Sequence, residues 1–251
     1  MGAADLHMHS VHSDGTSTVG AILHHASEHT DLDVIAITDH DTLRGALMAC
    51  EMAAQFRVEV IPRVEISTRE GHLLGLFLDK PIPPGLSYVE TAERVRLLGG
   101  LPFAPHPAGA LVSSVGAARL RRITTRFPGL MAGVEAANGS LPMSWENGRA
   151  EDLRWELQLP GIGNSDAHLL TQIGCARTAF AGSTAADLRT ALEAGTVVPL
   201  PVRRGGNYVC GVAMRWAWRW VSGIADTLDV KQGVLQDAGA RTVRLARLHV
   251  A

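Results

Sequence analysis

The chain has 251 residues of which 46% are hydrophobic, and it contains no run of about 18 apolar residues, so disorder over most of its length and a membrane-spanning helix are excluded. Its three cysteines, Cys50, Cys175 and Cys210, are widely spaced, which excludes a disulfide framework and leaves histidine and carboxylate as the only metal ligands. The net charge of -2 is uneven, because residues 203–251 carry eight Lys and Arg against three acidic residues.

Short apolar runs bounded by turn residues alternate with segments of helical period, a pattern typical of an α/β fold around a parallel sheet. In chain order, strands are predicted over 3–8, 34–38, 58–61, 72–78, 101–104, 130–136, 161–163 and 176–180. Helices are predicted over 19–29, 42–56, 91–98, 115–126, 144–159 and 185–194. About seven or eight such units predict a compact barrel, with a doubly wound open sheet as the competing architecture.

Three helix starts carry capping signals. Thr18 is expected to cap the helix over 19–29, and Ser87 with Glu90 forms the pattern of a capping box before 91–98. Asp41, jointly with Thr42, is expected to cap the helix that follows it.

Histidine is concentrated at the start of the chain, where seven of the eleven lie within the first 40 residues. His24, His25 and His29 fall on the first predicted helix, and the last two are spaced i, i+4. That spacing can bind zinc, but no carboxylate partner accompanies it, so a solvated helix face is favoured for these three.

Most of the metal-capable side chains stand where the predicted strands end. Because the carboxyl ends of parallel strands meet on one face, we expect these side chains to form one pocket. A single histidine is more often a surface or core residue; the repetition after successive strands favours a site. Imidazole and carboxylate without thiolate suit Mn, Fe or Zn and are poor for Ca. The residues are His7, His9, Asp39, His40, Asp41, Glu65, His106, Asp166 and His168.

Six motifs over residues 1–200 resemble, in order and spacing, those of the PHP (polymerase and histidinol phosphatase) family of metal-dependent phosphoesterases. They are most similar to the small stand-alone members, the RNase AM and TrpH-like group. The motifs are DLHMHSVHSDG at 5–15, ITDHD at 37–41, RVEIS at 63–67, GHLLGL at 71–76, APHP at 104–107 and GNSDAH at 163–168.

The resemblance implies a distorted (β/α)7 TIM-like barrel over residues 1–200 with a trinuclear site for two or three divalent ions, Mn, Fe or Zn. All nine ligand positions hold the expected residue type, which disfavours a decayed, regulatory copy. By motif, the first ion is assigned to His7, His9, Glu65 and Asp166, the second to Asp14, His40 and His168, and the third to the bridging Glu65 with His72 and His106. His12 is expected at the rim of the pocket.

The implied chemistry is hydrolysis of a phosphate ester by a hydroxide that bridges two ions. Glu65, Asp166 and His168 are the predicted catalytic residues, and either His168 or a water molecule on a metal would protonate the leaving group.

Each of three side chains beside the ligands has two alternative roles. Arg44 and Arg177 follow strand ends and are candidates to clamp a substrate phosphate, although a solvated arginine is the commoner case. Asp39 is either a partner of a ligating imidazole or an ordinary turn residue.

The predicted substrate is a nucleotide or short oligonucleotide phosphoester. One alternative is a small-metabolite phosphomonoesterase of the histidinol-phosphate phosphatase kind; another, outside enzymes, is a metal-dependent nucleic-acid-binding or sensor domain. Only 33 residues separate His72 from His106, where related RNase AM-like proteins carry a long insertion, so we expect a minimal cap and an open site.

Residues 201–251 form a basic extension, with a helix predicted over 211–228. Trp216 and Trp220 are expected to pack on the barrel or on a second subunit, with Trp218 more exposed, and packing is favoured over base stacking. The arginines of the extension could guide a polyanionic substrate to the acidic body, although a solvated tail is the commoner case. The N-terminus lacks the build of a signal peptide, so a cytoplasmic location without a membrane is predicted. The sequence makes no prediction of oligomeric state.

Overall fold

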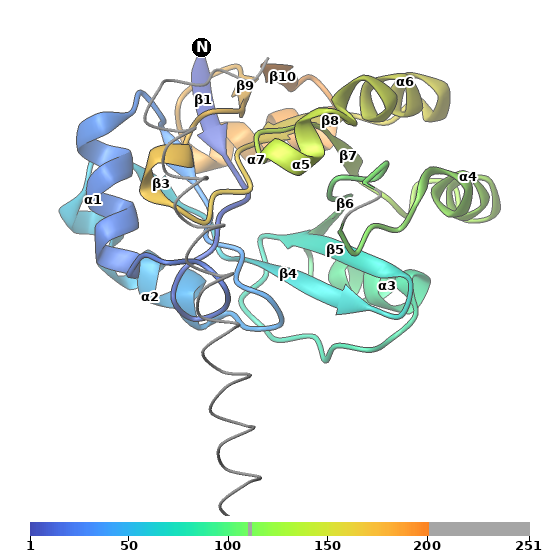
Figure 1. The fold of residues 1–251 in the computed structure, drawn as a ribbon, viewed down its shortest axis with the longest axis horizontal. Coiled ribbons are helices and arrows are strands. Elements are labelled where there is room, and N and C mark those ends of the chain that lie inside the picture. Colours follow the sequence, from blue (N-terminus) through green and yellow to red (C-terminus); the bar gives the residue numbers. More distant parts are fainter. Residues whose placement is uncertain (110–111, 201–251) are drawn as a thin grey trace, which may run out of the picture. The chain divides into compact units, whose positions relative to one another are not determined.

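A computed structural model describes residues 1–109 and 112–200 (Figure 1). The predicted extension over 201–251, including Trp216, Trp218 and Trp220, lies outside the described residues. In the part of the chain that is described, no helix has both the length and the apolar character to cross a membrane.

Strands and helices alternate along most of the chain, which confirms the predicted α/β class. The strands are β1 (Gly2–Asp5), β2 (Val34–Ile35), β3 (Glu59–Val60), β4 (Arg63–Thr68), β5 (Gly71–Leu76), β6 (Leu101–Ala104), β7 (Gly133–Asn138), β8 (Gly161–Asn164), β9 (Arg177–Phe180) and β10 (Val198–Leu200). The helices are α1 (Val19–His29), α2 (Arg44–Met52), α3 (Tyr88–Leu97), α4 (Ala117–Arg126), α5 (Leu141–Ser144), α6 (Asn147–Leu157) and α7 (Ala185–Ala194), with short 3₁₀ turns at Ala53–Gln55 and Leu170–Gln172.

Hydrogen bonds divide these strands into two five-stranded mixed sheets. The first has the order β10-β9-β1-β2-β3 and the second β4-β5-β6-β7-β8. Strands β1, β2 and β3 run parallel, as do β6, β7 and β8, whereas β5 is antiparallel to both of its neighbours. The predicted closed barrel is therefore not shown: an α/β fold with two mixed sheets takes its place.

The two sheets touch at isolated points. Parallel bridges join Met8 to Ala167 and His40 to Glu65. Between β8 and β9, the Thr178 hydroxyl accepts from the amide of Gly163 at 3.0 Å and donates to its carbonyl at 2.8 Å. A side chain therefore makes the hydrogen bonds that backbone pairing would make in a closed barrel.

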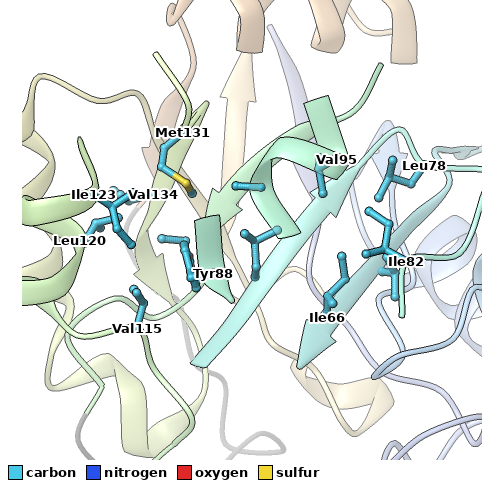
Figure 2. Close-up of a cluster of buried hydrophobic side chains, with 14 of the residues drawn as sticks. Ile66, Leu78, Ile82, Tyr88, Val95, Val115, Leu120, Ile123, Met131 and Val134 are labelled. Atoms are coloured by element: carbon cyan, nitrogen blue, oxygen red, sulfur yellow. The ribbon is translucent and has the colours of Figure 1, made fainter. Parts of the chain in front are cut away.

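Apolar packing joins the sheets as well. One buried cluster draws Leu6 and Val34 from the first sheet side and Leu74 and Phe103 from the second. A further cluster lies between β4, β5 and the helices α3 and α4, with Tyr88 and Val95 on α3 (Figure 2). Helices α1 and α2 cover the β1–β2 side with a third cluster. The polar residues that follow β1, β2, β6 and β8 do not belong to these apolar clusters.

Two helix caps are as predicted and one is not. The Thr18 hydroxyl accepts from the Ala21 amide at 3.3 Å, and Ser87 with Glu90 forms the capping box. Asp41 does not cap α2; its carboxylate accepts from the Ser67 amide at 2.7 Å, with its own backbone at φ 57°. The prediction failed because Asp41 bridges to β4, a strand that the sequence did not indicate.

Candidate metal centre

The nine predicted ligands lie at one edge of the fold, but not all for the predicted reason. His7 and His9 follow β1, His40 follows β2, His106 follows β6, and Asp166 and His168 follow β8. Glu65 instead lies within β4, and His72 is the second residue of β5. Because β5 is antiparallel to β6, the start of β5 lies at the same edge as the end of β6, and this brings His72 to the site.

Glu65 is the centre of the group. Its side chain is 1% exposed, and five imidazoles from four segments approach its two oxygens. The distances are 2.9 Å to His72 Nδ1 and 3.3 Å to His106 Nε2 from Oε1, and 3.0 Å to His7 Nε2, 3.3 Å to His9 Nε2 and 3.6 Å to His40 Nδ1 from Oε2. Both oxygens of this carboxylate therefore lie among imidazoles, and the bridging role stays a prediction.

Asp166 and Asp14 complete the group on the side of His9. Asp166 Oδ1 lies 3.4 Å from His9 Nε2 and 3.6 Å from His7 Nε2. Asp14 Oδ2 lies 3.0 Å from His168 Nε2, and its other oxygen is 3.5 Å from His9 Nδ1. The Asp14 side chain is 40% exposed, so this side of the centre faces solvent.

Four overlapping triads place their ligand atoms within 4.8 Å of one another, close enough for each to hold an ion. They are His7–His9–Asp166, His7–Glu65–His106, His9–Asp14–His168 and His9–His40–Glu65. The buried ring atoms His9 Nε2 and His40 Nδ1 have no hydrogen bond although both face Glu65. Buried polar atoms of this kind cost free energy unless a ligand takes them, and a divalent cation fits these donors.

The electrostatics favour ionised carboxylates. Burial opposes the charge on Glu65 and Asp166, but His7 and the neighbouring imidazoles outweigh it and hold the pKa of both carboxyls far below their usual range. Burial likewise lowers the pKa of His9, but Asp166 and Glu65 outweigh it and raise the pKa to about 9. Without metal, a proton on His9 therefore balances part of the carboxylate charge, and a cation would replace that proton.

The sequence missed Glu135, Asn138 and Asn164, which are buried behind the ligands. Glu135 contacts His7 Nδ1 at 3.0 Å, and the Asn138 amide reaches Asp166 Oδ2 at 3.3 Å. A glutamate inside the apolar run over 130–136 was the available signal, because a buried carboxylate needs partners. Arg63, two residues before Glu65, is also wholly buried, and its guanidinium nitrogens have no hydrogen bond.

Asp39 is not the partner of an imidazole. Its carboxylate accepts from the Ser10 amide at 2.8 Å, from the Ser10 hydroxyl at 2.7 Å and from the Ser13 hydroxyl at 2.8 Å. Asp39 therefore holds the loop that carries His9 and Asp14.

One of the two predicted phosphate clamps pairs with a residue outside the ligand set, and the other stays a prediction. Arg177 forms an ion pair with Asp31, in the loop between α1 and β2. Arg44 is the first residue of α2 with an exposed side chain. His12 is half-buried in the loop after His9.

On α1, the His25 and His29 rings lie 5.1 Å apart and the His24 and His29 rings 6.1 Å apart. His24 and His29 are exposed, in keeping with the predicted helix face.

Comparison with known proteins identifies a PHP domain over residues 5–97 and a PHP-associated region over residues 144–197. The chain is 39% identical over 124 residues to the uncharacterized protein MJ1587 of Methanocaldococcus jannaschii, covering 45% of this chain and 72% of that one. It is 28% identical over 194 residues to a 5'-3' exoribonuclease of Haemophilus influenzae, covering 75% of this chain and 63% of the relative, just under two thirds of its length.

A solved structure has the same fold. It is a two-domain protein from Bacteroides vulgatus containing a predicted PHP-like metal-dependent phosphoesterase, with a TM-score of 0.66 and 23% identity. The match covers 80% of this chain and 64% of that one.

Proposed function

Because this chain belongs to the PHP family, we propose that it is a metal-dependent phosphoesterase acting at the Glu65 centre. The observation that carries the proposal is the set of four overlapping triads, two of which contain the buried Glu65. We assign the ligands as the sequence predicts: His7, His9, Asp14, His40, Glu65, His72, His106, Asp166 and His168, for two or three ions of Mn, Fe or Zn.

Bound ions supply Lewis-acid chemistry, in that they draw charge from a phosphoryl group and make a water molecule more acidic. The protein contributes position and charge. The buried Glu65 lies between imidazoles that come from the two sheets. The proposed entry route for phosphate passes Asp14, whose side chain is 40% exposed. His168 Nδ1 lies 3.0 Å from the carbonyl oxygen of Asp166 and donates to it, so Nε2 is the ring atom turned to Asp14 and the entering group.

The proposed substrate is a nucleotide or short oligonucleotide phosphoester. Support comes from the Haemophilus influenzae relative, which is named a 5'-3' exoribonuclease. The short segment between His72 and His106 also suits a chain-like substrate, because it leaves little room for a cap over the site.

A metal-reconstituted activity screen tests the proposal. Chelator-treated protein is reloaded with Mn, Fe or Zn and offered p-nitrophenyl phosphate, its bis-ester, a 3',5'-bisphosphonucleotide, histidinol phosphate and a short RNA. Turnover of the nucleotide or RNA is expected. Turnover of monoesters alone would favour the small-metabolite phosphomonoesterase, and metal-dependent RNA binding without any turnover would favour the binding or sensor domain.

A further inference from the structure

Glu135 on β7 is a wholly buried carboxylate whose oxygens each have two partners. Oε1 lies 3.0 Å from His7 Nδ1 and 2.8 Å from Asn164 Nδ2. Oε2 lies 2.9 Å from the backbone nitrogen of His106 and 2.8 Å from Asn138 Nδ2. All four partners are nitrogen donors, so the acceptor positions of Glu135 are filled and none faces the space between the ligands.

We infer that Glu135 is a positioning residue, which sets the orientation of His7, His106 and Asp166 for metal without ligating it. The inference rests on the proposed function, because it requires that metal bind at this centre. A carboxylate behind a ligating imidazole fixes both the tautomer and the ring plane.

His7 shows the first part of this role. A carboxylate can only accept, so the proton must be on Nδ1 where His7 meets Glu135. Nε2 is then directed at the centre, 3.0 Å from Glu65 Oε2 and 3.6 Å from Asp166 Oδ1. Glu135 thus determines which nitrogen of His7 is offered to a cation.

His106 and Asp166 show the second part. The backbone at His106 has φ 31°, a conformation rare outside glycine, and the hydrogen bond from its amide to Glu135 holds it there. Asn138, which donates to Glu135, also reaches Asp166 Oδ2 at 3.3 Å. Three of the proposed ligands are therefore connected to one carboxylate.

The connections are one-sided. Glu135 reaches both triads that contain His7, but it has no hydrogen bond to His9, Asp14 or the His168 ring. The opposite side is held by Asp39 through Ser10 and Ser13. We therefore expect Glu135 to govern some of the ions and not all of them.

The test is Glu135→Gln, which keeps the shape but turns an NH2 group toward two donors. Equilibrium dialysis against Mn or Zn should give a 10- to 100-fold loss of affinity for the ions on the His7 side, with the remaining ion still bound. NMR of the ring nitrogens of ¹⁵N-labelled, metal-free protein should show that His7 loses its hydrogen-bonded Nδ1–H. Asp39→Asn, another buried carboxylate, is the matched control and should leave the His7 resonances in place.

Unchanged affinity for every ion together with an unchanged His7 spectrum would overturn the inference, as would an equal loss at all ions. If Glu135→Gln does not fold, Asn138→Ala is used, since it cuts only the link from Glu135 to Asp166 among the ligands; wild-type affinity in that variant would count against the role. Both readouts are independent of turnover. A wild-type protein that binds its ions but hydrolyses nothing would contradict the proposed function and leave this inference intact.

Discussion

Backbone strain occurs at two of the proposed ligands and directly after a third. Among the described residues, five that are not glycine have a positive φ, and Asp41 (57°), His106 (31°) and Asp166 (52°) are three of them. Such conformations cost about 1–3 kcal/mol each and persist where the surroundings determine them. The Ser67 amide donates to the Asp41 carboxylate, and the His106 amide donates to Glu135. These hydrogen bonds hold the backbone at Asp41 and His106 in place before metal binds.

Glu65→Gln tests the bridging role. An amide offers one acceptor oxygen in place of two, so the variant should lose metal content and reduce kcat by at least about 100-fold if the bridge sets the geometry for reaction. Metal analysis and steady-state kinetics measure both. Glu156→Gln, which breaks only an exposed pair with Arg121, is the control. A Glu65 variant with full activity would exclude the bridge.

The metal-free protein should lose stability as the pH rises from about 6.5 to 9. The pKa of His9 is raised to about 9 in the fold, above its unfolded value of 6.5. A raised pKa contributes stability that is complete below the unfolded value and is lost as pH passes the folded one, here on the order of 3 kcal/mol. Urea unfolding of chelator-treated protein at pH 6.5 and 9 measures the difference. His9→Gln should reduce it without removing it, because the pKa values of His7 and His106 are raised as well. A stability independent of pH over this range would contradict the assignment.

At the scale of elements, helix α2 approaches the loop of the centre through a glycine. A Cβ on Gly45 would lie 2.0 Å from Asp39 Oδ2 and 3.0 Å from Ser10 Oγ. Gly45→Ala should therefore displace Asp39 and destabilise the protein by about 1–3 kcal/mol, with weaker metal binding on the Asp14 side. Thermal unfolding and metal titration measure the two effects.

Gly148 on α6 is the matched control, because an added Cβ there meets nothing within 4 Å. Gly148→Ala should be neutral or stabilising by up to about 1 kcal/mol. Equal effects of the two substitutions on stability and metal affinity would contradict a role for the close approach of Gly45 to Asp39.

The sequence predicted the elements unequally. Helices with capping residues, such as those begun by Thr18 and Ser87, were found because the signals are local. Strand β4 was missed because buried Arg63 and Glu65 interrupt its apolar pattern. The antiparallel direction of β5 could not be predicted, because apolar periodicity is the same for parallel and antiparallel strands. The ligands were predicted from strand ends and motifs, whereas Glu135 was missed because its role depends on partners from four separate segments.

At the scale of the whole molecule, metal should stabilise the fold. Ligands that bind only the folded state add about 2.7 kcal/mol at 100 times their Kd. The melting temperature should rise when metal is added to chelator-treated protein, and the rise should be absent in Glu65→Gln. A rise of equal size in that variant would place the stabilising metal elsewhere.

The separation into a phosphoesterase unit and an extension stays a prediction. The first compact unit of the chain ends at Arg204 and contains all nine proposed ligands. A chain truncated there should keep hydrolysis of a small phosphate ester. If the basic extension steers a polyanionic substrate, truncation should lower kcat/KM for RNA at low salt and lose that effect at high salt. A salt-independent change would contradict steering.

The isolated bridges between the sheets have a consequence for how the protein opens. Glu65 belongs to one sheet, while His7, His9 and His40 stand on segments that leave the other, so ions shared among them would fasten the halves at the seam where backbone pairing is sparse. Amide exchange at this seam should then be slower, and more nearly concerted between the halves, in the loaded protein than after chelation. Metal supply would thus add to the shared apolar cluster in coupling the two halves, and with it change how readily a protease could enter.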